Sequence, residues 1–354
     1  MKIAFLPGDG IGPEITAATR MVLETFATKH GLAFDLSEIE IGETALASQG
    51  STFPEAAFEA ARSADGLILG PVSHLGYPPR DQGGLNPSGE LRKRLDLYAN
   101  IRPARTRDHL PSATGARFDM VIYRENTEGF YADRSMHSGP GELQVTEDVT
   151  LAMRRITRQA SMRIAEAAFA GAAGRRGKVT AVHKQNVLRL TDGLFLACCR
   201  EVAERHREIN YEELIVDAAC AHLVRRPADF DVIVTTNMFG DILSDLASEL
   251  SGSLGLAASL NAGADHAMAQ AQHGSAPDIA GKGIANPASL IGSMGMLLEW
   301  LGARHERPDL LAAGRSVLDA LERCLADPAT RTRDLGGDLN TQAFAQAVST
   351  QLAG

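Results

Sequence analysis

The chain has 354 residues, of which 44% are hydrophobic and 22% charged, which suits a globular protein with one large or two medium domains. A formal net charge of −9 argues against a general nucleic-acid surface. No apolar run approaches the length of a membrane span, and the chain starts directly with an expected strand, so we expect neither a membrane segment nor a signal peptide. The four cysteines lack CxxC spacing, which favours reduced thiols and a cytoplasmic location.

The first residues predict a strand at 2–6 and a helix that runs to about residue 30, joined by the turn PGDGIGPE. Gly8 and Gly10 fit the dinucleotide-binding fingerprint, but Pro13 stands where its third glycine belongs. Pro13 instead suits the first turn of a helix. The turn is therefore either a phosphate-binding loop or a tight connection between strand and helix.

Strands are expected at residues 34–41 and 66–69, with helices at 43–48 and 55–62 between them. This alternation predicts a parallel α/β sheet. Residues 70–88 are rich in glycine and proline and too long for an ordinary connection, which indicates a functional loop.

Three arginines lie near the ends of the next predicted elements, a helix and strand within residues 90–105 and a strand at 119–123. They are Arg92, Arg102 and Arg124. Arginine binds carboxylates through two parallel hydrogen bonds, so a di- or tricarboxylate is a plausible ligand. Each of them, taken alone, is better explained as a solvated surface residue.

The middle of the chain begins with a polar segment at about residues 135–150, which is either a protruding arm or a mobile surface loop. A long helix is expected at 151–170 and a strand at 179–183, which places Lys184 and Asn186 at a strand end. After a helix at 193–207, Asp217 follows an apolar run, where its carboxylate is either a ligand or a capping group.

Residues 231–235 predict a buried strand, and an amphipathic helix follows from about residue 239. Asp241 and Asp245 are four residues apart, so their carboxylates share one helix face and repel each other. A cation between them would relieve that repulsion, and hard oxygen ligands favour Mg²⁺ or Mn²⁺. For an isolated pair at this spacing, a solvated acidic face is the more frequent explanation.

The segment HGSAPDIAGKGIANP, at residues 273–287, contains no expected helix or strand and is long enough to hold a ligand. Asp278 suits hydrogen bonding to a ribose diol, which favours NAD over NADP, although a turn aspartate is the alternative. Helices at about 288–302, 308–326 and 341–352 end the chain.

Six segments together resemble one family: PGDGIGPE, LRKRLDLYANIRP, RENTEGFY, HKQNVL, TTNMFGDILSD and HGSAPDIAGKGIANP. The chain is similar to the β-decarboxylating dehydrogenases of isocitrate, isopropylmalate, homoisocitrate and tartrate or malate. The resemblance implies an α/β, isopropylmalate-dehydrogenase-like fold with two domains and a doubly wound sheet. The middle domain of such a fold forms the dimer interface and carries an intersubunit arm. It places the large cofactor-binding domain at residues 1–99 plus 252–354, the small domain at 100–251 and the arm at about 135–150. Such proteins are homodimers or dimers of dimers.

The resemblance also implies roles for particular residues. Arg92, Arg102 and Arg124 would clamp the malate carboxylates, and Asp241 and Asp245 would hold Mg²⁺ or Mn²⁺ with Asp217 of the partner subunit. Lys184, also from the partner subunit, would accept the hydroxyl proton, Tyr131 would protonate the enolate, and Asn186 would help to orient the site. NAD would lie along His273, Gly274, Ser275, Ala276, Asp278, Ile279 and Asn286.

Two positions depart from the family pattern. Gln270 stands where a glutamate is usual near the nicotinamide, which removes a charge but keeps a hydrogen-bonding group. Asn86 and Ser88 stand where the C3 substituent is read, and they either bind a carboxylate, as in isocitrate enzymes, or cap the following helix. A small polar pocket also fits malate or tartrate.

The resemblance therefore implies NAD- and Mg²⁺/Mn²⁺-dependent oxidative decarboxylation of a 3-substituted malate of the isopropylmalate or isocitrate type. The alternatives are a tartrate or D-malate dehydrogenase and a non-catalytic subunit of the same family. A third, a phosphate-binding α/β protein, leaves the arginines and aspartates unexplained.

Overall fold

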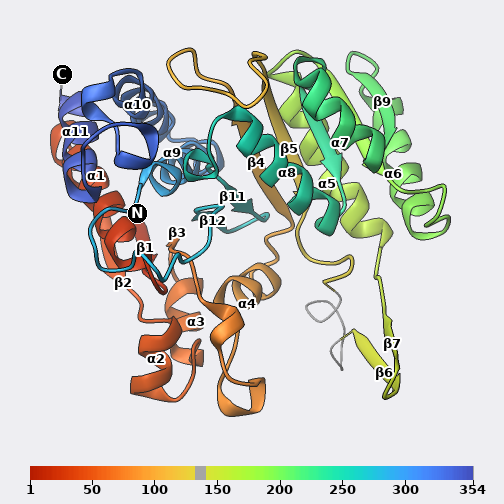
Figure 1. Ribbon diagram of the computed structural model, residues 1–354, viewed down its shortest axis with the longest axis horizontal. Coiled ribbons are helices and arrows are strands. Elements are labelled where there is room, and N and C mark those ends of the chain that lie inside the picture. Colours follow the sequence, from red (N-terminus) through yellow and green to blue (C-terminus); the bar gives the residue numbers. More distant parts are fainter. Residues whose placement is uncertain (132–140, 354) are drawn as a thin grey trace.

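A computed structural model describes residues 1–131 and 141–353 and contains one ten-stranded sheet (Figure 1). Most neighbouring strands are parallel, but the centre of the sheet is antiparallel. In spatial order the strands are β2 (Asp35–Glu38), β1 (Lys2–Leu6), β3 (Gly66–Leu69), β12 (Ala267–Gln270), β11 (Leu260–Ala262), β4 (Ala99–Arg105), β5 (Asp119–Glu125), β10 (Val232–Thr235), β8 (Lys178–His183) and β9 (Asn210–Ile215).

Helices cover both faces of the half-sheet from β2 to β11, because its central strands are apolar on both sides. In β1, Ile3 and Phe5 belong to the core beneath four helices, whereas Ala4 and Leu6 belong to the core on the other face. The first face carries α1 (Gly12–His30), α9 (Ala288–Arg304), α10 (Pro308–Ala326) and α11 (Thr341–Ala353). The second carries α3 (Glu55–Arg62) and α4 (Pro87–Arg94), which follow α2 (Gly42–Gln49) in the chain.

The half-sheet from β4 to β9 is covered in the same way (Figure 1). Val232 and Val234 of β10 pack under α5 (Arg158–Ala173) and α6 (Thr191–Arg205). Ile233 faces the opposite core, under α7 (Val216–Arg225) and α8 (Asn237–Ser251). The predicted doubly wound α/β architecture is confirmed.

The two half-sheets come from different parts of the chain. Strands β1, β2, β3, β11 and β12 lie at residues 2–69 and 260–270, and the other five lie between residues 99 and 235. The chain thus leaves the first half-sheet at β4 and returns to it after α8. Division into two domains stays a prediction, since one continuous sheet runs through both halves.

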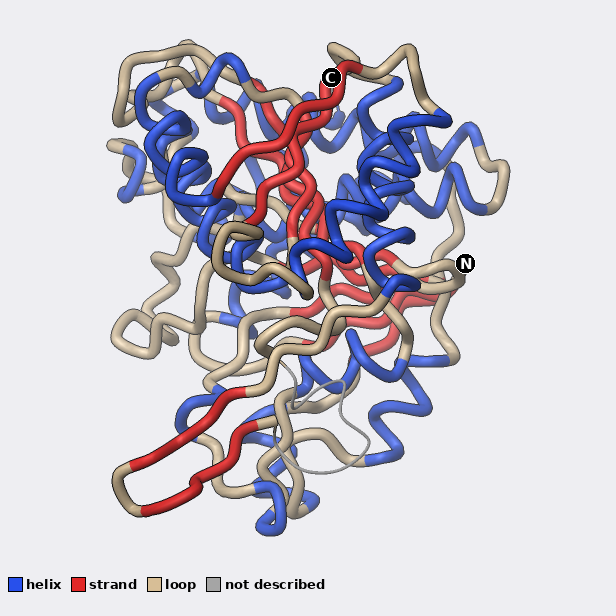
Figure 2. The backbone as a smooth tube through the Cα atoms, turned by 90° about the vertical axis from the view of Figure 1, so that its right-hand side faces the viewer, coloured by secondary structure: helices blue, strands red, loops and turns tan. Residues whose placement is uncertain are grey.

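A two-stranded hairpin, β6 (Glu142–Thr146) and β7 (Val149–Ala152), projects from the body of the molecule (Figures 1 and 2). Every residue of both strands is exposed. The predicted helix at 151–170 is therefore wrong at its start, because α5 begins at Arg158 after Thr157, whose hydroxyl accepts from Ala160 N at 3.2 Å. Residues 135–140 of the predicted arm lie outside the described residues.

Three strands of the ten-stranded sheet, β9, β11 and β12, were absent from the predictions. β11 and β12 are short, and their sequences, LNA and AMAQ, lack the β-branched residues typical of strands. In the described residues, no helix is long and apolar enough to cross a membrane.

Candidate active site

Three buried arginines line a cavity of about 320 Å³ near the centre of the sheet. Arg92 of α4, Arg102 of β4 and Arg124 of β5 are 8%, 6% and 2% exposed. Their interpretation as solvated surface residues is therefore wrong. Buried guanidinium groups require charged or polar partners, so their convergence marks a site built for anions. The cavity is also lined by Pro71, Val72, His74, Asn86, Ser88, Tyr131, Asp241 and residues 270–274.

Strand register brings two of these arginines onto one face of the sheet. In the antiparallel pair β4 and β5, Asn100 lies opposite Arg124, and Arg102 opposite Ile122. Because side chains alternate along a strand, Asn100, Arg102 and Arg124 all point to the same side. Arg102 Nε donates to Asn100 Oδ1 at 3.1 Å, which fixes the guanidinium over the cavity.

Capping fixes the third arginine. Asn86 precedes α4, and its Oδ1 accepts a hydrogen bond from Gly89 N at 3.2 Å. Pro87 then occupies the first turn, where a missing N–H costs nothing. The helix buries Leu91 and Arg92 together. Asn86 thus caps the helix, one of its two predicted roles, while also lining the cavity.

Asp241 and Asp245 lie one turn apart on α8, with Arg102 between them. Arg102 Nη1 is 3.3 Å from Asp241 Oδ1 and 3.3 Å from Asp245 Oδ1, and it donates to Ser244 Oγ at 2.7 Å. Arg124 also pairs with Asp241 through Nη1. Both carboxylates are therefore ion-paired, although Asp245 is exposed to solvent as well. Within this chain, cationic side chains offset their mutual repulsion.

Burial and charge act against each other in this group. Burial tends to raise the pKa of Asp241, but Arg124 and Arg102 outweigh it, so that the pKa is lowered. Burial and the neighbouring Arg124 lower the pKa of Arg102 to about 10. Both groups therefore remain charged at neutral pH, and the site keeps its ion pairs.

Tyr131 lies over the same aspartate. Its hydroxyl donates to Asp241 Oδ2 at 3.0 Å, and the guanidinium carbon of Arg124 is 5.6 Å from its ring centroid. Tyr131 is thus the one residue with a hydroxyl group in the YRENTEGFY segment that lines the cavity. A bound carboxylic acid held by the arginines would lie beside it.

Lys184 and Asp217 lie away from this cavity in the same chain. Lys184 Nζ donates to Asp217 Oδ1 at 2.6 Å, and the pair lies where β8 ends and α7 begins. Hydrogen bonding from Lys184 lowers the pKa of Asp217. Asn186 is exposed nearby. Neither Lys184, Asp217 nor Asn186 lines the cavity, so a single chain separates the predicted catalytic residues into two groups.

The donor set suits a hard divalent cation only in part. Asp241 and Asp245 provide carboxylate oxygens on one helix face, with side chains 36% and 52% exposed, and Gln272 Nε2 orients Asp245 from 2.8 Å. Among the described residues, no three histidine, cysteine, aspartate or glutamate side chains lie close enough to hold a metal. One or two carboxylates can hold Mg²⁺ when water fills its other positions, so Asp241 and Asp245 could provide the protein ligands of such a site.

Sequence reasoning missed the importance of Gln270 for the arginine cluster. Its Oε1 accepts from Arg92 Nη2 at 2.9 Å and Ser88 Oγ at 3.1 Å, and it lies 3.4 Å from Asn261 Nδ2. The amide thus joins α4 to β12 and β11 at the cavity wall. Neither Gln270 nor Ser88 belongs to a local motif that predicts this contact across 182 residues of sequence.

The predicted nucleotide-binding segment borders a second cavity of about 420 Å³. His273 and Gly274 line both cavities, so the two adjoin. Burial lowers the pKa of His273, which favours its neutral form. Of the predicted contacts, Ala276, Ile279 and Asn286 also line the second cavity, whereas Ser275 and Asp278 are not among its lining residues.

Two contacts organise this segment. Ser275 Oγ bonds Ser73 Oγ at 2.9 Å, and Asn286 Nδ2 donates to Asp334 Oδ2 at 2.9 Å. Asp334 also lines the cavity and was not predicted. Asp278 is exposed beside this cavity, on the segment that also carries Ala276 and Ile279. An adenine would therefore find an apolar surface from Ile11 and Ile279, with polar groups at its edge.

The glycine turn after β1 is a tight packing element. A side chain at Gly8 would meet Pro71 O at 2.2 Å, and one at Gly10 would meet Ser275 O at 2.0 Å. Both glycines also have positive φ angles, 73° and 57°. Asp9 N and Ile11 N each donate to backbone carbonyls at 2.8 Å. These N–H groups are therefore engaged by protein, which favours the structural interpretation over phosphate binding.

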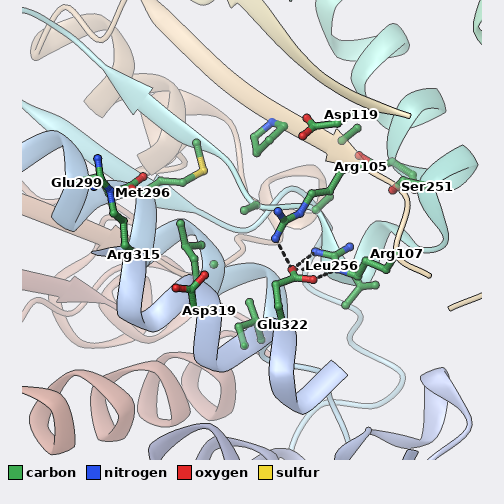
Figure 3. Close-up of a pocket in the computed structure, with 18 of the residues that line it drawn as sticks. Arg105, Arg107, Asp119, Ser251, Leu256, Met296, Glu299, Arg315, Asp319 and Glu322 are labelled. Carbon is green, nitrogen blue, oxygen red and sulfur yellow. Dashed lines mark hydrogen bonds and ion pairs between the residues drawn. The ribbon is translucent and has the colours of Figure 1, made fainter. Parts of the chain in front are cut away.

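Another cavity of about 420 Å³ lies between β4, α8, α9 and α10 (Figure 3). Its arginines are paired with acids. Arg105 and Arg107 approach Glu322 at 2.7 and 2.9 Å, Arg175 approaches Asp119 at 2.7 Å, and Arg315 approaches Glu299 at 3.8 Å. The lining of this cavity holds four arginines and four acidic residues, whereas that of the smaller cavity holds three arginines and one carboxylate. The smaller cavity is therefore the better site for an anionic substrate despite its smaller volume.

Comparison with known proteins agrees with this geometry. The family model for isocitrate/isopropylmalate dehydrogenase matches residues 2–348. An isocitrate/homoisocitrate dehydrogenase of Thermus thermophilus is 44% identical over 349 residues, covering 98% of this chain and 97% of that protein. A 3-isopropylmalate dehydrogenase of Archaeoglobus fulgidus is 42% identical over 353 residues, covering 99% of both. The crystal structure of isocitrate dehydrogenase from Methylococcus capsulatus superposes with a TM-score of 0.87 at 38% identity, covering 100% of this chain and 99% of that one.

Proposed function

Because the chain belongs to the isocitrate/isopropylmalate dehydrogenase family, and is thus a decarboxylating dehydrogenase of a hydroxy acid, we propose that its substrate is a malate substituted at C3. We propose further that it uses NAD with Mg²⁺ or Mn²⁺ and releases CO₂, a 2-oxo acid and NADH. The observation that carries this proposal is the convergence of three buried arginines and Asp241 on one cavity, with Asp245 one helical turn away and paired with Arg102.

The arginines fit the two carboxylates that every malate derivative carries. Arg102 and Arg124 come from one sheet face, and Arg92 comes from α4 and lines the same cavity. Guanidinium groups bind carboxylates through two parallel hydrogen bonds, so three of them can fix both ends of a diacid. Fixing both ends sets the orientation of the C2 hydrogen and hydroxyl, which is the main requirement for stereospecific oxidation.

The divalent cation and NAD would both bind beside the substrate. Asp241 and Asp245 would hold a divalent cation together with Asp217 of a second subunit, and the cation, when bound, supplies Lewis-acid polarisation of the substrate oxygen. Residues of the second cavity, including Ile279 and Asn286, would hold NAD, which accepts a hydride from C2 when bound. Asp278 would favour NAD over NADP, since a carboxylate repels the extra phosphate.

Two side chains move protons in this scheme. Lys184 takes the proton of the C2 hydroxyl as the hydride leaves, directly or through water. After loss of CO₂ the substrate carbon needs a proton, and the Tyr131 hydroxyl, held at 3.0 Å from Asp241, gives it. Asn186 would help to orient the site.

The active site would be shared between two copies of the chain. Lys184 and Asp217 lie outside the cavity that Asp241 lines in the same chain, which supports their supply by a second copy. The hairpin β6–β7 presents Leu143, Val145, Val149 and Leu151 to solvent, with side chains 45% to 57% exposed. An exposed apolar hairpin is typical of a protein–protein contact, and a homodimer or a dimer of dimers would bury it.

The polar wall at Asn86 and Ser88 also supports a second candidate, D-malate or tartrate, because these substrates need no apolar pocket. NADH formation with Mn²⁺ should be measured across isopropylmalate, isocitrate, homoisocitrate, malate and tartrate, with NADP in parallel. Turnover that requires Mn²⁺ and falls roughly 100-fold or more in Asp241→Asn supports the proposal. Normal activity of Asp241→Asn would refute it, and binding of substrate and NAD without turnover would indicate a non-catalytic subunit.

A further inference from the structure

We infer that Gln270 determines substrate specificity by presenting its amide N–H groups to a carboxylate on C3 of the substrate. A malate that carries a C3 carboxyl group would then be preferred over one that carries an alkyl group or hydrogen. This inference rests on the proposed function, and it names the substrate class within it: a tricarboxylic hydroxy acid.

The backbone of Gln270 is held rigidly at the end of β12. Its N donates to Ser259 O at 3.1 Å, and its carbonyl accepts from Ser259 Oγ at 2.8 Å and Ser293 Oγ at 3.0 Å. The three preceding residues of β12 are fully buried, while Gln270 is partly exposed. Its side chain is therefore the first of this strand to reach the cavity that it lines.

The surrounding donors fix which way the amide points. Arg92 Nη2 lies at 2.9 Å from Oε1, Ser88 Oγ at 3.1 Å and Asn261 Nδ2 at 3.4 Å. A guanidinium has no acceptor, so turning the amide by 180° would set N–H against N–H at Arg92. The carbonyl oxygen must face these groups, and Nε2 must face away from them.

Nε2 is consequently available to a ligand. Among residues 1–131 and 141–353, no side chain or backbone oxygen accepts a hydrogen bond from it, and it is not one of the buried polar atoms without a partner. Two N–H bonds at an accessible point of a cavity wall require an acceptor in place of the water that they lose when substrate binds. A carboxylate oxygen provides that acceptor, whereas an isopropyl group does not.

The rest of the wall agrees with an anionic substituent. Asn86, Ser88 and His74 line the cavity near Gln270, and Val72 is the one branched aliphatic side chain in the described lining.

The variant Gln270→Glu distinguishes the two functions of this amide, which are acceptance by Oε1 and donation by Nε2. Glutamate keeps an oxygen acceptor for Arg92 and Ser88 but replaces the N–H donors by a negatively charged oxygen. We expect kcat/KM for isocitrate, relative to that for 3-isopropylmalate, to fall roughly 10- to 100-fold. Gln346→Glu, on the exposed face of α11, adds the same charge far from the cavity and should leave this ratio unchanged.

Three results would overturn the inference. A wild-type chain that prefers 3-isopropylmalate or malate to isocitrate and homoisocitrate contradicts it, even if no variant can be purified, while leaving the proposed function intact. A Gln270→Glu variant with a changed KM for NAD and an unchanged substrate ratio shows that the amide serves the nicotinamide carboxamide instead. Absence of metal-dependent NADH formation with every hydroxy acid removes the proposed function itself, and the inference with it.

Discussion

Arg154 and Asp192 form a buried ion pair at the base of the hairpin, with side chains 6% and 0% exposed. Arg154 also donates to Thr236 Oγ1 at 3.0 Å, immediately before the helix that carries Asp241. The other oxygen of Asp192 accepts from Lys184 N at 2.5 Å. The pair therefore fixes the hairpin, the start of α8 and the backbone of Lys184 relative to one another.

Replacing Arg154 by methionine should destabilise the fold strongly, because it leaves the Asp192 carboxylate buried without its cation. The expected loss in the free energy of unfolding is about 3–5 kcal/mol. Denaturant unfolding measures it. Arg158→Met removes a surface pair with Glu201, with side chains 57% and 44% exposed, and should cost under about 1 kcal/mol. Equal losses in the two variants would show that burial of the Arg154 pair has no energetic consequence.

Tyr131→Phe should slow decarboxylation and reprotonation more than hydride transfer. The variant keeps the ring next to Arg124 but removes the hydroxyl that lies 3.0 Å from Asp241. A lost general acid typically costs about 10²- to 10⁴-fold in its own step. Supplying the 2-oxo intermediate externally isolates the later steps from oxidation. Equal losses in both partial reactions would remove Tyr131 from the proton-donating role.

Lys184→Met should impair oxidation most, because the hydroxyl proton then has no nearby acceptor. Decarboxylation of an externally supplied 2-oxo intermediate should be less affected. The comparison uses single-turnover hydride transfer and CO₂ release from the same preparation. Hydride transfer at the wild-type rate in this variant would refute the role assigned to Lys184.

Stability should fall with rising pH because of Glu128, a buried carboxyl group that is 3% exposed. Burial raises its pKa to about 7, and the nearby Glu125 adds to the increase. The pKa in the folded state is above the ordinary value of 4.5, so folding favours the protonated form of Glu128. The stabilisation that this protonated carboxyl group provides is complete below pH 4.5 and is lost as the pH rises through about 7.

Glu128→Gln should therefore flatten the dependence of the unfolding midpoint on pH between about 5 and 8, while Gln Oε1 can still accept from Thr157 N. Parallel curves for the wild type and Glu128→Gln would show that this carboxyl group does not titrate in that range.

Local patterns predicted much of the fold. Helix α10 matches the expected residues 308–326, and α3 matches 55–62. Both helices have amphipathic spacing, and a proline marks the start of each: it lies in the first turn of α10 and immediately before α3. The spacing of Asp241 and Asp245 also predicted their shared helix face. These features depend on residues within one or two turns of each other.

Features that depend on distant contacts were not predicted. Burial of Arg102 and Arg124 follows from the register of β4 with β5 and from their packing against α8, about 120 to 140 residues later. The orientation of Gln270 depends on Ser88, Arg92 and Asn261 together. The start of α5 was misplaced because residues 149–152 pair with β6 instead of extending the helix. Local propensity carries no information on such pairing.

The central claim is that Asp241 of one subunit and Lys184 of another form one active site, since one chain keeps them apart. Mixing inactive Lys184→Met with inactive Asp241→Asn under conditions that exchange subunits tests this directly. Each mixed dimer would contain one site with both native residues, so an equal mixture should recover roughly a quarter of wild-type activity. No recovery, although mixed dimers form, would contradict a shared site.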